Sequence, residues 1–335
     1  MSNDPLNPPA DTQPGKTLSV APMMAWTDRH CRYLHRLYSP WALLFTEMVT
    51  TGALLHGQRW HLLDYSPAEH PIVLQLGGNN PMDLARCTAE AELRGYEEVN
   101  LNVGCPSDRV KNGSFGACLM KQPDLVADCI KQMIEHCNIP VSVKCRLGVD
   151  DADSDALLHE FVASVADTGC TRFYLHARKA ILKGLSPAQN RSVPPLQPER
   201  VALLKERFPH LTIVVNGGIT DTATGLGHLE WADDIMIGRA AYQQPSLLTD
   251  LTRAMFDPNW RIRETEIIAA YRAYMEEELA KGTRLHSMTR HLLNCFAGVP
   301  GARRFRRILS DHKRLGTQDI NILDDALDTL QLRAA

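Results

Sequence analysis

The chain has 335 residues, 44% of them hydrophobic and 22% charged, with a formal net charge of −3. This composition is ordinary for a globular protein that can bury a large core, as one big domain with an accessory one. We expect no membrane span, because no run of about 18 apolar residues occurs. The nine cysteines are odd in number and none has CxxC spacing. This pattern argues against a disulfide framework or a metal site such as zinc, and it predicts a reducing, cytoplasmic location.

Between residues 18 and 255 the hydrophobic pattern predicts a strand followed by a helix, eight times over. The predicted strands are residues 18–24, 43–49, 72–78, 99–104, 141–148, 172–178, 212–218 and 234–240. The helical patterns between them include residues 82–93, 124–136, 155–167 and 198–208. Eight such units favour an α/β fold of the (β/α)8 TIM-barrel type. A doubly wound sheet is the alternative, although no GxGxxG follows the first strand.

Four of these strands alternate apolar and polar residues, as Leu74 and Leu76 do with Gln75. We expect the apolar set to face the surrounding helices and the polar set to face the barrel interior. The polar residues that would then converge at one rim are Gln75, Asn102, Lys144, His176 and Asn216. Catalytic and ligand-binding residues of barrels usually lie at this rim, so the convergence predicts an enzyme.

The segment from Asn100 to Pro106 is typical of a strand that ends in a glycine turn and presents Cys105 beside two side-chain amides. A thiol in that position is suited to proton donation, or to nucleophilic attack if it is deprotonated. No residue nearby in the sequence decides between the two roles. The other eight cysteines are assigned to packing.

Glycine motifs end the seventh and eighth predicted strands, as Gly217-Gly218 and Gly238-Arg239. Paired glycines let main-chain amides approach an anion, and barrels often hold phosphate between these two loops. Tight turns that need glycine for a positive φ are the alternative. Lys144 could form a rim ion pair or stabilise negative charge on a bound cofactor. His176 could be a satisfied core histidine or a functional one.

After the barrel, residues 262–281, 286–296, 303–312 and 320–330 have helical spacing, which Gly298 to Gly301 interrupts. We therefore predict a disordered leader at residues 1–16, a barrel at 17–256 and a small all-helical domain at 257–335.

Two segments of the chain are basic enough to suggest phosphate binding. The predicted helical domain contains the arginine run, defined as Arg303, Arg304, Arg306 and Arg307. Such a run is often only solvated, but without compensating acids it is suited to bind phosphates. The second segment, Ala188 to Arg191, lies in a long insertion at residues 185–197, on the predicted catalytic rim.

Ordered motifs along the chain resemble the tRNA-dihydrouridine synthase family, and most of all its A-type subfamily. These motifs are Ala21 to Met24 with Thr27 and Asp28, Leu74 to Gly78, Asn100 to Pro106, Val143 to Gly148, His176 to Arg178, Asn216 to Gly218, and Gly238 with Arg239. The match extends from about residue 18 to the C-terminal helices, and no motif position departs from the family pattern.

The resemblance implies an FMN-bearing enzyme that reduces the C5–C6 double bond of uridines 20 and 20a in the tRNA D-loop, with NADPH as the reductant. Cys105 would be the general acid. The residues expected to hold FMN are Pro22, Met23, Met24, Gln75, Lys144, His176, Asn216, Gly217, Gly218, Gly238 and Arg239. The residues expected to contact tRNA are Asn102, Ala188, Arg191, Arg304 and Arg307. We expect a monomer with no obligate protein partner.

Two other functions fit the same residues. A small-molecule FMN oxidoreductase would share the barrel, the flavin and the thiol, but it would leave the arginine run without a role. A non-catalytic RNA-binding protein would keep the barrel as a relic and would carry no flavin.

Overall fold

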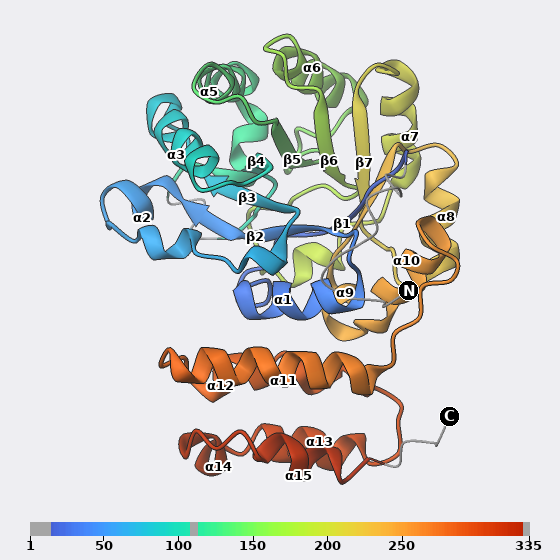
Figure 1. Ribbon diagram of the computed structural model, residues 1–335. Helices are drawn as coiled ribbons and strands as arrows, with labels where there is room; N and C mark the ends of the chain where they lie inside the picture. The colour runs from blue at the N-terminus through green and yellow to red at the C-terminus, as the bar shows by residue number, and fades with distance from the viewer. Residues whose placement is uncertain (1–14, 108–112, 331–335) are drawn as a thin grey trace.

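The strands close into a barrel that helices surround (Figure 1). There are eight, all parallel and in chain order, and β8 pairs with β1. The computed structural model describes residues 15–107 and 113–330, so most of the predicted leader lies outside the described residues. The strands are β1 (Leu18–Val20), β2 (Leu43–Thr50), β3 (Ile72–Gly77), β4 (Glu98–Val103), β5 (Val141–Arg146), β6 (Arg172–His176), β7 (Thr212–Asn216) and β8 (Asp234–Ile237). The (β/α)8 prediction is therefore confirmed, and the doubly wound alternative is wrong.

Helices surround the barrel, and proline begins three of them. The α-helices are α1 (Arg29–Tyr38), α2 (Thr51–Leu55), α3 (Pro81–Leu93), α5 (Pro123–Glu135), α6 (Asp155–Ala166), α7 (Pro198–Arg207), α8 (Thr222–Leu229), α9 (Arg239–Gln243) and α10 (Ser246–Met255). Short 3-10 turns are η1 (Trp60–Leu63), η2 (Pro67–Glu69), η3 (Gly116–Lys121) and η4 (Gln189–Arg191). Proline occupies the first turn of α3, α5 and α7, where its missing amide would have no helical acceptor.

Side-chain alternation along the strands produces separate apolar clusters on the two faces of the barrel wall. Leu74, Leu101 and Val143 belong to the large core that the strands share with the surrounding helices. The interior cluster consists of Ala21, Leu43, Phe45, Val73, Tyr174, Val214 and Met236. It fills the barrel below the carboxyl ends of the strands, so the polar residues that follow it in each strand face the mouth.

Several predicted strands extend past their observed ends. β1 ends at Val20 rather than at residue 24, β5 at Arg146 rather than at 148, and β7 at Asn216 rather than at 218. Gly217 and Gly218 have φ values of +115° and +74°, which lie outside the strand region. These residues belong instead to the loops at the barrel mouth.

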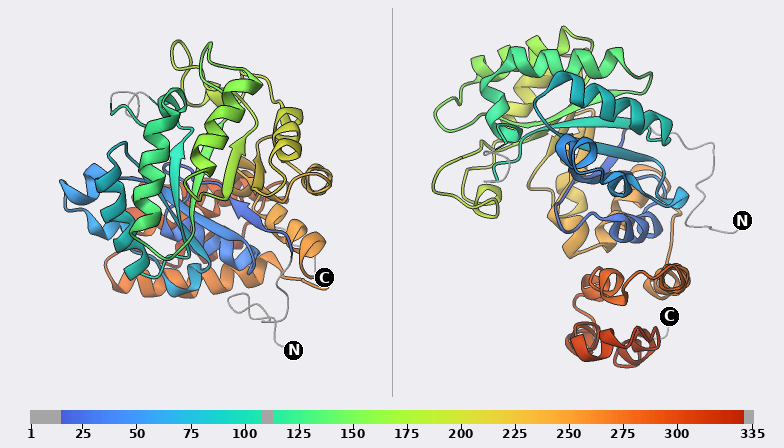
Figure 2. Two further views of the ribbon diagram at one scale, coloured as in Figure 1. Left: turned by 90° about the horizontal axis from the view of Figure 1, so that it is seen from above. Right: turned by 90° about the vertical axis from the view of Figure 1, so that its left-hand side faces the viewer.

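The chain beyond α10 forms two further layers of helices on one side of the barrel (Figures 1 and 2). Its elements are α11 (Glu264–Ala280), α12 (Leu285–Thr289), η5 (Leu292–Asn294), α13 (Ala302–Leu309), α14 (His312–Gly316) and α15 (Ile322–Leu327). The predicted helix at 303–312 is shorter, because the Asp311 side chain accepts the Lys313 amide at 3.0 Å and begins α14. The domain boundary at 256/257 stays a prediction.

The inner helical layer rests on α1. Arg29 forms an ion pair with Glu278 of α11, and the rings of Tyr33 and Tyr274 stack with centroids 3.9 Å apart. Near the start of the described chain, Lys16, the last residue of the predicted leader, donates to the carbonyl of Ala232 at 2.9 Å. This last leader residue is therefore anchored to the barrel.

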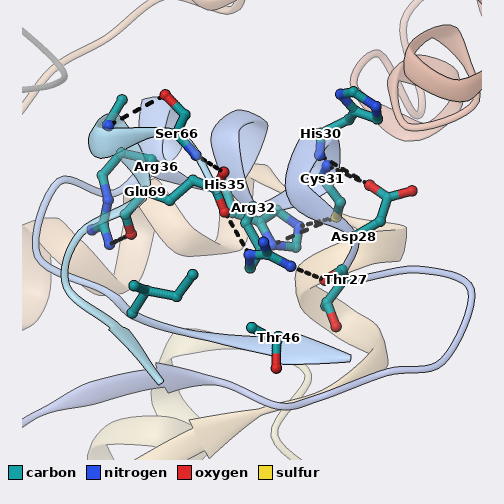
Figure 3. Close-up of polar contacts among 12 residues, drawn as sticks. Thr27, Asp28, His30, Cys31, Arg32, His35, Arg36, Thr46, Ser66 and Glu69 are labelled. Carbon is teal, nitrogen blue, oxygen red and sulfur yellow. Dashed lines mark hydrogen bonds and ion pairs between the residues drawn. The ribbon is translucent and has the colours of Figure 1, made fainter. Parts of the chain in front are cut away.

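A buried polar network fixes α1 to the connection between β2 and β3 (Figure 3). Arg32 pairs with Glu69 of η2 at 2.6 Å, and both side chains are almost completely buried. Arg32 also donates to the carbonyl of Thr27 at 2.8 Å. Arg36, likewise buried, donates to the carbonyls of Glu69 and Pro71 at 2.9 and 3.1 Å. Of these two arginines, only Arg32 holds the loop after β1, which forms one wall of the barrel mouth.

Candidate active site

A cavity of about 1050 Å³ opens at the carboxyl ends of the strands. Most of the residues proposed from the sequence line it: Pro22, Met23, Met24, Gln75, Asn102, Cys105, Lys144, His176, Arg191, Asn216, Gly217, Gly218, Gly238 and Arg239. Residues from seven strands or the loops after them thus meet in one place. Ala188, Arg304 and Arg307 are not part of this lining.

The turn that presents Cys105 is shaped by the side chain of Asn102. The Oδ1 atom of Asn102 accepts the amides of Gly104 and Cys105 at 3.1 and 2.9 Å, which is a side-chain-stabilised turn. The Cys105 carbonyl in turn accepts the Ala117 amide at 2.9 Å. The thiol is half-buried and lies 3.4 Å from the hydroxyl oxygen of Ser107. The backbone therefore holds the sulfur at the cavity wall.

A row of side-chain amides crosses the barrel beneath this turn. Asn102 Nδ2 donates to Gln75 Oε1, and Gln75 Nε2 donates to Asn100 Oδ1, each at 2.8 Å. Asn100 then donates to the Ser142 hydroxyl at 2.8 Å. Asn102 therefore uses its carbonyl oxygen and one amide hydrogen inside the protein. Its predicted contact with RNA is left with the second hydrogen of Nδ2 and stays a prediction.

Lys144 is held at the mouth by a neutral partner. Its Nζ donates to Asn216 Oδ1 at 2.9 Å, and Asn216 Nδ2 donates to the carbonyl of Met236 at 2.8 Å. Within the described residues no carboxylate pairs with Lys144, so they give no support to the rim ion pair considered from the sequence. Burial, helped by the charge of Arg146, lowers the pKa of Lys144 from 10.5 to about 8.

His176 faces the cavity rather than the core. Among the residues that the structure describes, neither of its ring nitrogens has a hydrogen-bond partner, so the satisfied core histidine is wrong. Burial first, then the charges of Arg146 and Lys144, lower its pKa well below the ordinary value. The imidazole is therefore neutral at physiological pH, with one donor and one acceptor to offer a ligand.

The first glycine loop is packed so closely that larger residues would clash there, whereas a Cβ added to Gly238 would meet no atom within 4 Å. A Cβ added to Gly217 would lie 2.9 Å from Cδ2 of His176, and one added to Gly218 would lie 2.3 Å from Cδ2 of Leu196. In the described part of the chain, no acceptor is found for the main-chain amides of Gly217, Gly218, Gly238 and Arg239. Positive φ values meet the tight-turn requirement at Gly217 and Gly218 but not at Gly238, whose φ is −104°. The unpaired amides make both loops suitable for an anion.

Basic side chains dominate the charge around the cavity. The basic group comprises Arg29, Arg32, Arg59, Lys144, Arg146, Arg178, Arg191 and Arg239. The acids at the cavity are Asp28, Glu47 and Asp64. Arg146 and Arg178 belong to motifs noted in the sequence, but no role was predicted for either. Arg146 lies two residues after Lys144 in β5, so its side chain points to the same, interior side of the barrel. This alternation would have identified Arg146 as a cavity residue.

The arginine run lies away from the cavity, on the outer helical layer. Arg303, Arg304 and Arg307 of α13 are exposed, and within the described residues none of the four arginines forms an ion pair. Ala188 is exposed directly before η4 and does not line the cavity. A ligand that touched both the cavity and α13 would have to extend from the barrel mouth to the outer helical layer.

Three general features concern the cysteines, possible metal ligands and possible membrane-spanning helices. All nine cysteines are free thiols. The described residues contain no group of three or more His, Cys, Asp or Glu side chains placed to hold a metal ion. No described helix is both long and apolar enough to cross a membrane.

The fold and the mouth define a (β/α)8-barrel protein in which a thiol, a lysine and a neutral histidine surround one basic cavity. The sequence pattern of the family described as dihydrouridine synthase matches residues 19–331. A tRNA-dihydrouridine(20/20a) synthase from Yersinia pestis is 53% identical over 316 residues, which cover 94% of this chain and 91% of the relative. A protein of the same name from Escherichia coli is 52% identical over 313 residues, covering 92% and 90%. A third, from Vibrio cholerae, is 51% identical over 312 residues, covering 92% and 95%. The chain therefore belongs to the dihydrouridine synthase family, whose members are flavin-dependent enzymes.

Proposed function

We propose that this protein reduces uridines 20 and 20a of the tRNA D-loop to 5,6-dihydrouridine, the activity for which the relatives from Yersinia pestis and Escherichia coli are named. One observation carries the proposal: the Cys105 thiol, the Lys144 cation and the two glycine loops open onto the same cavity. Reduction of a conjugated double bond needs a hydride donor and a proton donor on one substrate, and a single shared cavity meets that requirement.

The cavity suits FMN as the flavin. Its phosphate would be held by the amides of the loops at 217–218 and 238–239, together with the Arg239 side chain. The ring system would be held by Gln75, Lys144 and His176, with residues 22–24 along one edge. Bound FMN would supply the hydride, and NADPH would reduce the oxidised FMN again after each turnover.

Cys105 supplies the proton in this scheme. Hydride addition at carbon 6 of uracil leaves negative charge shared between carbon 5 and the oxygen on carbon 4. The Cys105 S–H bond breaks as a C–H bond forms at carbon 5, and the electron pair stays on sulfur. The nearby cations Lys144 and Arg146 favour that thiolate and the developing charge on the base.

The substrate base must leave its stack to reach the barrel mouth, and this costs least in a loop that is already distorted. Arg191 lies at the rim of the cavity, while Arg304 and Arg307 lie on the outer helical layer. A folded tRNA is large enough to contact both regions. None of these three arginines forms an ion pair with another described residue, and such cations are suited to the phosphates of tRNA, through charge and shape.

We further propose that the protein acts as a cytoplasmic monomer, with the nicotinamide of NADPH visiting the flavin transiently. The nine free thiols support a reducing compartment. The 257–335 segment is proposed as the tRNA-binding domain, because it contains the unpaired arginine run.

The test uses purified, FMN-loaded protein, NADPH and an unmodified tRNA transcript, with dihydrouridine mapped by nucleoside mass spectrometry of nuclease fragments. We expect dihydrouridine at positions 20 and 20a, and none in a control transcript with cytidine at both positions. Reduction of free uridine at the same rate as tRNA would favour the small-molecule oxidoreductase instead. A colourless protein that cannot take up FMN would contradict the proposal altogether.

A further inference from the structure

Arg146 is a buried arginine whose hydrogen-bond partners are main-chain carbonyls. It is the last residue of β5 and is 3% exposed. Its Nε donates to the carbonyl of Gly104 at 2.9 Å, and its Nη1 donates to the carbonyls of Lys179 and Asn190 at 3.0 Å each. Within the described residues it forms no ion pair. The guanidinium thus joins the residue before Cys105 to the loop that follows β6.

Asn190 makes that loop a closed unit. Its side chain is fully buried, accepts the Ile181 amide and donates to the Ile181 carbonyl, both at 2.8 Å. The same side chain donates to the Ser186 carbonyl at 3.3 Å. The backbone from 181 to 190 is therefore fixed around one side chain, and a displacement at one end is passed to the other.

The next residue, Arg191, connects this unit to the cavity. Its side chain lines the cavity, and its carbonyl accepts Nη2 of Arg239 at 3.1 Å. Two consecutive carbonyls are thus held by two arginines: Asn190 by Arg146 on the thiol side, and Arg191 by Arg239 on the glycine-loop side. Arg191 itself can contact the substrate, whereas Arg146 connects the backbone behind it to the Cys105 turn.

We propose that Arg146 is a positioning residue that couples substrate contact at Arg191 to the placement of the Cys105 thiol, an inference that rests on the proposed function. Because the Gly104 and Asn190 carbonyls share one rigid, planar guanidinium, a shift of the loop at Arg191 moves the turn that bears the sulfur. Contact with tRNA at the rim then fixes the acid over the base. A lysine could keep the charge but not the planar set of donors that reaches all three carbonyls.

The decisive measurement is a double-mutant cycle with Arg146→Lys and Arg191→Ala in the FMN-loaded protein. The rate of flavin reoxidation by saturating unmodified tRNA is followed after reduction by NADPH. We expect Arg146→Lys to lower this rate at least about tenfold, and the double variant to be within about twofold of the slower single variant. We also expect Arg191→Ala to lower kcat as well as raise KM.

Arg36→Lys is the matched control. Arg36 is also a buried arginine that donates to main-chain carbonyls, but it lies on α1 outside the cavity. Its effect on the rate, if any, should multiply with that of Arg191→Ala. Multiplying effects of Arg146→Lys and Arg191→Ala, or an Arg146→Lys rate equal to wild type, would overturn the coupling.

A second measurement does not depend on uridine reduction. The rate at which iodoacetamide labels Cys105 is followed by mass spectrometry, in FMN-loaded protein without tRNA. We expect this rate to change at least about threefold in Arg146→Lys and to stay near wild type in Arg36→Lys. If Arg146→Lys does not fold, Asn190→Asp is used instead, because Asn190 provides one of the carbonyls that Arg146 contacts. It should change the labelling rate as well. An unchanged labelling rate would overturn the positioning role, whereas a wild-type protein inactive on tRNA would overturn only the proposed function.

Discussion

Lys144 Nζ donates to Asn216 Oδ1 at 2.9 Å, which joins the carboxyl ends of β5 and β7 across the intervening strand β6. The amide partner orients the ammonium group without neutralising it, unlike a carboxylate. Burial lowers the pKa of Lys144 to about 8, close to physiological pH. A proton is therefore easily lost from a group that is proposed to contact the flavin.

This relationship predicts a pH-dependent affinity for FMN. The lysine is a cation below its folded pKa and neutral above it, so favourable charge interactions with FMN are lost as the pH rises through about 8. We expect the Kd of the apoprotein for FMN to rise between pH 7 and 9, by at most about tenfold per pH unit above the pKa. The Kd is measured at each pH by titrating FMN with the apoprotein and following FMN fluorescence. Lys144→Met should bind FMN more weakly at pH 7 and show little change up to pH 9. A wild-type Kd that is constant over this range would contradict a role for the cation.

Cys105→Ala should separate binding from catalysis. The variant keeps the Asn102 side-chain bonds, since these use main-chain amides. We therefore expect normal FMN content, normal tRNA affinity and a normal rate of flavin reduction by NADPH. Reoxidation by unmodified tRNA should slow by about 10²- to 10⁴-fold, the usual contribution of a general acid.

Cys118→Ala is the control for this substitution. Cys118 is also a half-buried thiol, but its sulfur donates to the carbonyl of Phe115 and it does not line the cavity. Its rate should match wild type. If Cys105→Ala also turns over at the wild-type rate, another group donates the proton.

Gly218→Ala should damage the loop that is proposed to hold the FMN phosphate. The residue has a φ of +74°, and its added Cβ would lie 2.3 Å from Cδ2 of Leu196. Alanine costs about 1 kcal/mol for that backbone conformation alone. Gly282→Ala carries the same backbone penalty, at a φ of +88°, but would meet no atom within 4 Å. We expect both variants to lose stability in urea, Gly218→Ala at least as much as Gly282→Ala because of the added clash. Bound FMN, measured by absorbance after desalting, should fall at least about tenfold only in Gly218→Ala. Equal FMN content in both variants would argue against that role of the loop.

The arrangement of the cavity was predictable wherever it follows from strand periodicity. Successive side chains of a strand point to opposite faces of the sheet, so the positions of Gln75 and Lys144 in their strands predict that both face the barrel interior. The glycine loops followed from chain order, because consecutive parallel strands end at the same rim. The strand ends were less accurate, since the apolar pattern continues into residues whose φ values exclude a strand, such as Gly217.

The contacts that orient these groups were not predictable. Asn102 was assigned to RNA from family resemblance, yet its side chain holds the turn of Cys105. Arg146 meets Asn190 from a position 44 residues away in sequence. Such pairings depend on which backbone atoms a folded loop brings next to a side chain. Neither residue type nor spacing in the sequence predicts this. For the same reason, the distance between the arginine run and the cavity appeared only in the structure.

Charge reversal of the outer helical layer should weaken tRNA binding without affecting the chemistry. Arg304 and Arg307 are exposed on α13, and neither forms an ion pair in the described part of the chain, so their loss breaks no salt bridge there. For Arg304→Glu/Arg307→Glu we expect at least about a tenfold rise in the Kd for tRNA and a salt-dependence slope smaller by about two, one for each lost phosphate contact. Thermal stability and FMN reduction by NADPH should not change.

Arg86→Glu/Arg207→Glu provides the same change in net charge on α3 and α7, at exposed residues outside the cavity that form no ion pair in the described part of the chain. If the loss of affinity came only from general repulsion, both double variants would bind tRNA equally poorly and with the same slope. A loss specific to α13 would instead mean that particular phosphates contact it. Filter binding across a range of salt concentrations distinguishes the two outcomes, because specific contacts change the slope and the affinity together.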